Sequence, residues 1–403
     1  MAGVQRAEPF ALPVTPLLRR LDLTDFRNYA ALTWRPTARI QVITGPNGSG
    51  KTNLLEAISL LTPGRGLRGA RMAELPRHGG AGGWAVAARF TTEAGTLEIG
   101  TGSPAEAASE RRVFRLDGAA PRSQAEVAAR LVAVWLTPQM DRLFQEGASG
   151  RRRFLDRLVW ALEPGHAREV AAHDAAMAQR NRLLAEGGAD PAWLAGLESS
   201  MARHAVAATA ARMALVARLN TALTGGTPYD LGAFPAARLG LACPIAERLR
   251  AAPALAVEEW LADALAARRR QDAEAGSAGL GAHRADMTLA DAATGLAAAQ
   301  ASTGQQKALL IGVVLGHAAL IAAARGVPPL LLLDEPAVHL DRDRRAALFA
   351  ALAALPAPAL LTGTDTEIFT PLRDVAEAWR VTDALLIPDP DFPAIAPPPQ
   401  GQK

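Results

Sequence analysis

The sequence predicts an α/β fold: a mixed sheet around a phosphate-binding loop, interrupted by an inserted, mainly helical second domain. Three observations predict it. A strand-like run at 38–44 leads through a glycine-rich turn into a helical pattern. The stretch 150–275 is helical in pattern and rich in Ala and Arg. Apolar runs at 330–333 and 359–362 then return the chain to a buried parallel sheet, whose strands read as continuous apolar segments.

The individual elements follow in chain order. Residues 18–44 are expected to form two strands, 18–26 and 38–44, joined by a polar turn. A helix is expected to begin near Lys51, because apolar residues then recur at helical spacing. Short alternating segments such as 84–90 and 113–116 indicate an antiparallel sheet on the same lobe. The later helical stretch is interrupted at the turn-forming residues 187–188 and 225–235.

Composition excludes several classes of protein. The 403 residues suffice for a main domain plus an insert, and 43 Lys and Arg nearly balance 40 Asp and Glu. Any basic surface must therefore be local. The lone Cys243 and the absence of zinc-like Cys/His spacing favour a reduced compartment, so we expect a cytoplasmic protein. Residues 1–16 lack the apolar region of a signal peptide, and no uninterrupted apolar run reaches the roughly 20 residues of a membrane helix.

The strongest motif is a complete phosphate loop between the strand at 38–44 and the following helix. It comprises Gly45, Pro46, Asn47, Gly48, Ser49, Gly50, Lys51 and Thr52, followed by Asn53. Glycines let backbone N–H groups turn toward phosphate oxygens, Lys51 reaches the β- and γ-phosphates, and the Thr52 hydroxyl ligates Mg²⁺. This chain uses only three lysines, so a lysine here favours an ATP and Mg²⁺ site over an ordinary glycine-rich turn.

A second motif is the apolar strand 330–333, which ends in Asp334 and Glu335. Asp334 is predicted to hold Mg²⁺, and Glu335 to act as the general base that polarises the attacking water. The alternative is an acidic pair that begins the next helix. The phosphate loop elsewhere in the chain favours the catalytic interpretation.

A third motif lies at 302–307, before an apolar helix. The Ser302 hydroxyl, the Gly304 backbone and the positive end of the helix dipole could face a γ-phosphate. The alternative is a simple serine N-cap. The second interior lysine, Lys307, argues for a more specific role, because arginine serves general surface positions in this chain.

The three motifs together resemble SMC-like ABC-type ATPases, with 302–307 similar to the ABC signature. Five further segments are similar to the RecF family. They are Asp25-Phe26-Arg27-Asn28-Tyr29, Gly64-Arg65-Gly66-Leu67-Arg68, Arg151-Arg152-Arg153-Phe154-Leu155-Asp156, Gly281-Ala282-His283-Arg284-Ala285-Asp286 and Thr362-Gly363-Thr364-Asp365. Near the segment that ABC proteins call the Q-loop, the family usually carries Pro-Glu, whereas this chain has Pro138-Gln139. Gln139 is therefore expected to contact Mg²⁺ or water. Thr364 and Asp365 stand in place of a switch histidine and are the two candidates for sensing the γ-phosphate.

The resemblance implies an ABC-type ATPase head with an inserted helical domain. The expected division is a disordered tail 1–17, the ATPase lobe 18–136 and 301–387, the helical domain 137–300, and a disordered Pro-rich tail 388–403. It further implies an ATP-dependent homodimer that hydrolyses ATP slowly, recognises gapped DNA, and promotes RecA loading with RecO and RecR in recombinational repair. A transporter ATPase subunit and an SMC-type architectural protein remain the alternatives.

DNA contact has weaker support in the residues themselves. Arg151, Arg152 and Arg153 open a helix with three adjacent positive charges, and arginine forks bind phosphates well. A solvated helix surface explains such a run equally well. His283, Phe26 and Tyr29 are interpreted as structural residues.

Overall fold

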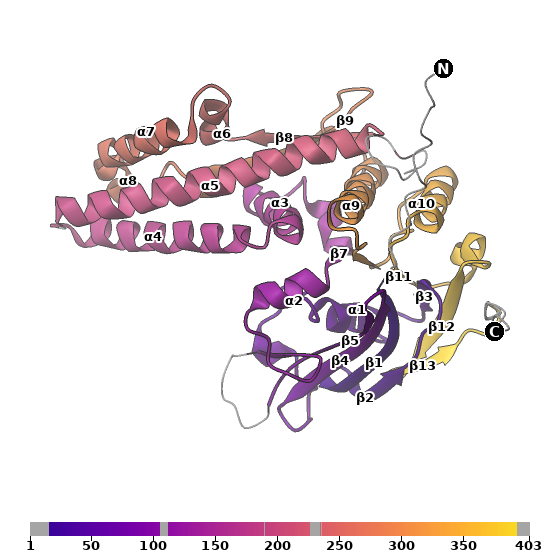
Figure 1. Cartoon of the computed structure of the whole chain (residues 1–403). Helices are drawn as coiled ribbons and strands as arrows, with labels where there is room; N and C mark the ends of the chain where they lie inside the picture. The colour runs from indigo at the N-terminus through magenta and orange to yellow at the C-terminus, as the bar shows by residue number, and fades with distance from the viewer. Residues whose placement is uncertain (1–15, 105–111, 189, 226–233, 235, 393–403) are drawn as a thin grey trace, which may run out of the picture.

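The computed structural model describes residues 16–104, 112–188, 190–225, 234 and 236–392, which form two sheets and a long helical arm (Figure 1). An antiparallel sheet has the order β2-β1-β4-β5-β6. Its strands are β1 (Leu17–Phe26), β2 (Tyr29–Trp34), β4 (Trp84–Thr92), β5 (Gly95–Ser103) and β6 (Val113–Leu116). The second sheet has the order β13-β12-β3-β11-β10-β7. Its strands are β3 (Ile40–Thr44), β7 (Ala133–Leu136), β10 (Leu330–Leu333), β11 (Ala359–Gly363), β12 (Ala376–Thr382) and β13 (Leu385–Pro388).

The second sheet is mixed, as the sequence predicts. Strands β12, β3, β11, β10 and β7 run parallel, and β13 alone is antiparallel at the edge. The two strands expected within 18–44 are present as β1 and β3, but a further strand that was not predicted, β2, lies between them in the chain and pairs with β1, while β3 joins the other sheet. Likewise β7, at the end of the predicted antiparallel region, lies beside β10. Its four residues are all buried, a pattern that suits a parallel strand covered on both faces.

Helix α1 (Lys51–Ser59) lies between the two sheets, and α9 (Thr303–Arg325) and α10 (Arg342–Ala354) cover the opposite face of the mixed sheet. Strand β10 shows why both faces are apolar. Leu330 and Leu332 pack into the core around α1, whereas Leu331 and Leu333 pack into the core around α9 and α10. The carboxyl ends of the parallel strands meet at one edge of this sheet, which places the loops after them together.

The predicted helical part contains six helices among its described residues. They are α3 (Ala148–Leu162), α4 (His166–Glu186), α5 (Pro191–Leu223), α6 (Pro244–Leu249), α7 (Ala254–Ala267) and α8 (Arg269–Ala275). The sequence analysis missed a two-stranded antiparallel sheet of β8 (Ala237–Ala242) and β9 (Asp286–Asp291) in this part. Helices α4 and α5 pair along the length of the arm (Figure 1). One short helix, α2 (Gln124–Arg130), belongs to the lobe of the antiparallel sheet, below the arm.

Helix α9 is long and apolar enough to cross a membrane by length and composition, with a mean hydropathy of 2.0 over its best window. Within the protein, 83% of that window is buried. Its apolar surface is therefore buried in the core that it shares with α10 and the helical part, as in the central helix of a globular domain.

Two of the family-like segments, distant in sequence, are bonded to each other within the helical part. Arg151 donates to both carboxylate oxygens of Asp286, at 2.7 and 2.9 Å, and Arg152 donates to the carbonyl oxygen of Ala285 at 3.0 Å. Arg212 of α5 donates to both oxygens of Asp156 and to the carbonyl oxygen of Ala282. This buried polar network fixes the start of α3 against the loop before β9.

Replacing Asp156 with asparagine is expected to destabilise the protein by about 3–5 kcal/mol, because Arg212 is only 1% exposed and would keep an uncompensated charge. Burial tends to raise the pKa of Asp156, but hydrogen bonds from His166 and Arg212 outweigh it and hold that pKa below its usual range. The stabilisation is therefore present above the unfolded pKa of about 3.9 and is lost as the pH falls through the folded pKa.

Urea unfolding at pH 7 and below pH 4 measures this effect, with Asp263→Asn on exposed α7 surface as the matched control. The difference between Asp156→Asn and the wild type should be large at pH 7 and should shrink in acid. A variant as stable as the control at pH 7 would contradict the role of this carboxylate.

Both chain ends depart from the predicted tails where the structure describes them. Leu17 already belongs to β1. At the other end, Asp389 and Phe392 are buried, and the Asp389 carboxylate accepts hydrogen bonds from Thr366 and Arg380. The predicted disorder was therefore wrong for 388–392, because one buried carboxylate and one aromatic ring anchor the segment. The remainder of both tails, 1–15 and 393–403, lies outside the described residues.

Candidate functional site

The phosphate loop joins β3 to α1 at the carboxyl edge of the mixed sheet. Gly45, Gly48 and Gly50 have φ values of 145°, 82° and 114°, a region that side chains disfavour. A Cβ on Gly45 would lie 2.5 Å from the carbonyl oxygen of Val381, and one on Gly50 would lie 2.5 Å from the amide nitrogen of Asn28. Glycine is thus required at these two turns for both conformation and space.

Lys51 is held inside the loop, with its side chain bent back over it. Its residue is 5% exposed, and Nζ donates to the carbonyl oxygens of Gly45 at 2.7 Å and Pro46 at 2.9 Å. Burial lowers the pKa of Lys51, and the nearby Glu335 and Asp334 partly offset that shift. The loop therefore carries a largely desolvated ammonium group beside exposed backbone.

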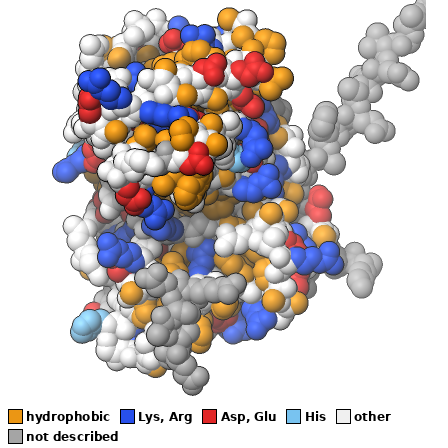
Figure 2. All heavy atoms as spheres, turned by 90° about the vertical axis from the view of Figure 1, so that its left-hand side faces the viewer, with side chains coloured by type: hydrophobic (Ala, Val, Ile, Leu, Met, Phe, Trp, Pro, Cys, Tyr) orange, Lys and Arg blue, Asp and Glu red, His pale blue; other side chains and the backbone are white. Residues whose placement is uncertain are grey.

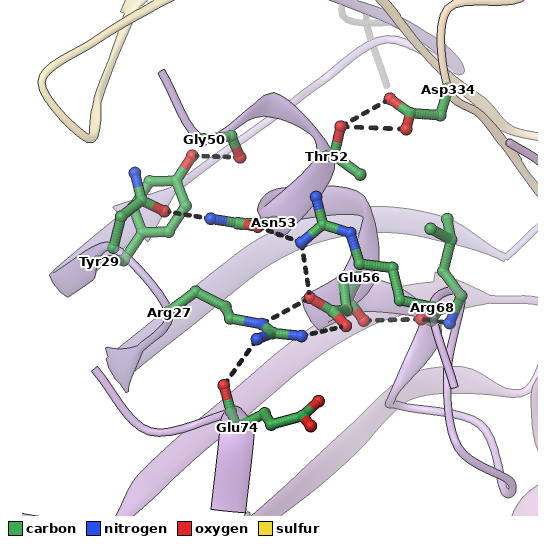
Figure 3. Close-up of polar contacts among 12 residues, drawn as sticks. Arg27, Tyr29, Gly50, Thr52, Asn53, Glu56, Arg68, Glu74 and Asp334 are labelled. Carbon is green, nitrogen blue, oxygen red and sulfur yellow. Dashed lines mark hydrogen bonds and ion pairs between the residues drawn. The ribbon is translucent and has the colours of Figure 1, made fainter. Parts of the chain in front are cut away.

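A hydroxyl and a carboxylate meet next to this loop. The Thr52 hydroxyl lies 3.0 Å from each carboxylate oxygen of Asp334 (Figure 3). Thr362, at the end of β11, donates to Asp334 at 2.7 Å and so fixes its orientation. Mg²⁺ prefers such oxygen ligands, and these groups match the pair that holds Mg²⁺ at a phosphate loop.

Glu335 has a strained backbone, with a φ of 49°. Its N–H donates to the Thr362 hydroxyl at 2.9 Å, and its carbonyl oxygen accepts from Lys307 at 2.9 Å. These bonds fix the main chain that carries the Glu335 carboxylate, directly after Asp334.

The residues of the loop fit a nucleotide triphosphate with Mg²⁺. The Ser49 hydroxyl oxygen is buried and has no hydrogen-bond partner among the described residues. Residues Pro46 to Gly48 are exposed, whereas Lys51 and Asp334 lie behind them. A phosphate group would satisfy both the orphan hydroxyl and the desolvated ammonium, and it would do so at the positive end of α1.

A polar network that the sequence analysis did not assign supports the loop from below (Figure 3). Asn28 donates to the carbonyl oxygen of Ser49, and the Tyr29 hydroxyl donates to that of Gly50, both at 3.1 Å. Phe26 and Tyr29 are fully buried, which confirms their structural interpretation. The segment 25–29 is thus the platform of the phosphate loop.

The same network engages α1 from its exposed side. Arg27 donates to both oxygens of the buried Glu56 at 2.8 Å, and Arg68 approaches Glu56 at 3.4 Å. Asn53 donates to Asn28 at 2.8 Å and accepts from Arg68 at 2.7 Å. Both ends of the Asn53 carboxamide are therefore engaged within the chain, so a contact of Asn53 with nucleotide would come from its backbone.

Gln139 lies in the turn Pro138–Arg142 that follows β7, the neighbour of β10. Its side chain is exposed at the same sheet edge as Asp334. Asp141, two residues further on, lies 3.4 Å from Lys307. The turn is thereby tied to the start of α9, while Gln139 itself stays free to meet a ligand at that edge.

Ser302 and Gly304 lie at the exposed start of α9. Ser302 forms a capping box with Gln305, so the simple N-cap interpretation also describes its geometry. A Cβ on Gly304 would lie 2.8 Å from the carbonyl oxygen of His339, which requires a small residue there. Lys307 does not face this exposed start: it is 1% exposed and binds the carbonyl of Glu335, so its role is to join α9 to the loop after β10.

The loop after β11 holds both switch candidates. Thr364 and Asp365 are exposed, and Asp365 accepts from the N–H of Glu367 at 3.0 Å. The neighbouring Thr366 is bonded instead to Thr44 and to the buried Asp389. Both candidates line a cavity of about 510 Å³ beside Gly45 and Pro46, so the choice between them stays open.

The arginines proposed for DNA contact are largely used within the chain. Arg151 and Arg152 bind Asp286 and the Ala285 carbonyl, and only Arg153 of the three is exposed. His283 Nε2 donates to the Ala278 carbonyl oxygen at 2.9 Å, and burial lowers the pKa of His283 to about 4. Most of this region therefore serves contacts within the helical arm.

Known proteins are similar to this chain in sequence and in fold. The family model described as the RecF/RecN/SMC N terminal domain matches residues 17–359. The DNA replication and repair protein RecF of Mesorhizobium japonicum is 46% identical over 381 residues, covering 94% of this chain and 100% of that protein. RecF of Rhizobium etli is 44% identical, covering 92% of this chain and 99% of its own length.

Two solved structures share the fold. Both are of the recombination mediator protein RecF of the RecFOR pathway, with ATPrS in one and ATP in the other. Their TM-scores are 0.80 and 0.77 at 20% and 21% identity, and each match covers 93% of this chain and 99% of the solved one. This chain belongs to the RecF family, with the fold of SMC-like ABC-type ATPase heads.

Proposed function

We propose that this protein binds and slowly hydrolyses ATP with Mg²⁺, and that ATP closes a homodimer on gapped DNA during recombinational repair. The observation that carries the proposal is the meeting of Lys51, Thr52 and Asp334, which come from two ends of the chain, beside the constrained Glu335. The sequence relatives are DNA replication and repair proteins, and one of the two RecF structures contains ATP, which supports the same assignment.

Each residue has a distinct role in the proposed reaction. Lys51 neutralises the β- and γ-phosphates and the charge that develops during transfer, while Thr52 and Asp334 hold the metal ion. Mg²⁺ supplies charge stabilisation on the phosphate oxygens when bound. The Glu335 carboxylate orients the attacking water and accepts its proton. Gln139, at the same edge of the sheet, contacts Mg²⁺ or water.

In the cell, we place the protein in the cytoplasm with RecR, RecO and RecA as its partners, because the two solved RecF proteins are recombination mediators of the RecFOR pathway. ATP hydrolysis then serves as a switch that releases DNA. This role differs from that of a transporter subunit, which would not respond to DNA.

The decisive experiment measures ATP hydrolysis alone and with gapped, single-stranded and blunt duplex DNA of one sequence. We expect stimulation by DNA, strongest with the gapped substrate. Hydrolysis that is indifferent to every DNA would overturn the repair function and favour the transporter class.

The exposed start of α9 predicts that Ser302 acts across the dimer, on the γ-phosphate held by the second copy. Ser302→Arg and Lys51→Ala should each be inactive alone. Mixed together, they should regain part of the activity, because one heterodimer site combines an intact phosphate loop with an intact Ser302. Hydrolysis by the mixture, compared with that of each variant, measures this effect.

Two controls complete this test. Ser199→Arg, which adds the same charge to an exposed position on α5, should remain active. If crosslinked heterodimers bind ATP yet stay inactive, a mixture of wild type with Lys51→Ala shows whether one filled site suffices. Activity in that second mixture would rule out the action of Ser302 across the dimer.

A further inference from the structure

A large open cavity on the lobe of the antiparallel sheet has no part in the ATP site. Its volume is about 1100 Å³, and it lies between the loop after α1, the edge strand β6 and the segment before α2. Four arginines line it: Arg65, Arg71, Arg112 and Arg115. No acidic side chain is present among the described lining residues. The cavity therefore has a strongly positive lining in a chain whose total charge is only +3.

Three of these arginines are exposed and unpaired among the described residues. Arg65, Arg71 and Arg115 have no side-chain hydrogen bond or ion pair with other described residues, in contrast to Arg27, Arg151 and Arg212. Guanidinium groups that are left unpaired around one concavity raise the local potential and remain available to a ligand.

Arg112 forms the floor of the cavity. Its guanidinium lies 4.4 Å from the centre of the Phe114 ring and donates to the Thr62 carbonyl at 3.3 Å, while its other terminal nitrogen is buried without a partner. Burial lowers its pKa to about 10, so it stays charged at neutral pH. A buried donor without a partner indicates that the site is built for an additional acceptor.

The lining also indicates which polyanion fits. Proteins that hold single strands stack bases on exposed aromatic rings, but Phe114 is 8% exposed and lies under Arg112. The described lining residues thus provide arginine guanidinium groups but no exposed aromatic ring on which a base could stack. Forks of this kind bind the phosphate backbone, which is the accessible feature of a duplex.

We propose that this arginine cavity holds the phosphate backbone of duplex DNA; the assignment rests on the proposed DNA-binding function and gives it a location. Figure 2 faces the side of the molecule where α2 lies in Figure 1; Lys and Arg side chains, interspersed with Asp and Glu, are visible on this face of the arm and of the lobe below it.

The cavity is also connected to the ATP site. Arg65 and Arg71 belong to the loop that follows α1, and Arg68 of that loop binds Asn53 and Glu56 of α1 itself. A change in the position of this loop on DNA binding would therefore be transmitted to α1, the helix that begins with Lys51 and Thr52. The connection consists of the chain itself, since the loop directly follows α1, and of the hydrogen bonds of Arg68.

The test compares two full-length triple variants that lose equal charge. Arg65→Gln/Arg71→Gln/Arg115→Gln removes the exposed arginines of the cavity and leaves Arg112 in place for folding. The control removes Arg35, Arg89 and Arg270, which are exposed elsewhere. Both should retain the wild-type melting temperature, and the ATP affinity of each is measured first. Fluorescence anisotropy with ATP then measures affinity for a blunt duplex and for a single strand over a range of salt concentrations.

The cavity variant should bind duplex at least about tenfold more weakly than the control, and its slope of log K against log salt should be smaller by about 2–3, the value for three lost phosphate contacts. Equal affinity and slope in the two variants would overturn the cavity assignment. An equal loss for duplex and single strand would overturn the duplex preference, and a loss of ATP affinity with DNA binding intact would make this a nucleotide site. If the wild type itself fails to bind DNA, the proposed function fails instead.

Discussion

Replacing Lys51 with alanine is expected to weaken ATP binding by about 100-fold or more and to abolish ATP-dependent dimerisation and hydrolysis. The reason is the position of the ammonium group, which is buried in the phosphate loop and bonded to its Gly45 carbonyl, where it supplies the positive charge for the phosphates. Isothermal titration calorimetry with ATP and Mg²⁺ measures the loss directly.

A matched variant separates charge from packing. Lys51→Met keeps most of the aliphatic stem inside the loop but removes the ammonium, so it should be as defective as Lys51→Ala. Both variants should melt near the wild-type temperature, because the platform of Asn28 and Tyr29 supports the loop independently. Wild-type ATP affinity in either variant would remove the phosphate-loop assignment.

Glu335→Gln is expected to slow hydrolysis by about 10²–10⁴-fold while ATP still binds, which is the usual contribution of a general base. The amide has the shape of the carboxylate but cannot accept the proton of the attacking water. The backbone bonds to Thr362 and Lys307 do not involve the side chain, so the strained turn should persist. Single-turnover hydrolysis measures the chemical step without product release.

The same variant should hold the dimer closed on DNA for longer, because ATP is bound but not consumed. Sedimentation with ATP and Mg²⁺ should show a stable dimer. Glu367→Gln, at an exposed position beyond the switch candidates, is the control and should hydrolyse normally. A purely monomeric Glu335→Gln protein in the presence of ATP would argue against Glu335 as the base.

Much of the fold could be predicted because its strongest signals are local. The parallel strands at 330–333 and 359–362, and the strand, loop and helix at 40–59, each fall within a few consecutive residues. The strand β2 was missed because a six-residue strand with three exposed positions has little apolar signal, and its partner is chosen by tertiary packing. The ordered segment 388–392 was missed because one buried carboxylate carries no compositional signal.

The candidate site shows the same division. A contiguous motif identified Lys51 and Thr52, and a second identified Asp334 and Glu335, although only folding brings Thr52 within 3.0 Å of Asp334. Lys307 shows the limit of this reasoning. Its retention as lysine pointed to a specific role, but the contact is with the Glu335 carbonyl rather than with the exposed helix start.

From residue order alone follow the fold class, the phosphate loop, the acidic pair and the family, since each is a pattern of consecutive residues whose backbone geometry is set locally. The roles of the arginines could not be predicted in this way, because the neighbouring sequence of an arginine does not show whether its guanidinium is buried in an ion pair or exposed. The tertiary structure assigns Arg151 and Arg212 to buried ion pairs with Asp286 and Asp156, and leaves Arg65, Arg71 and Arg115 around an open cavity. Whether an arginine is neutralised depends on acidic residues far away in the sequence, and only the tertiary structure determines which of them lie within ion-pair distance.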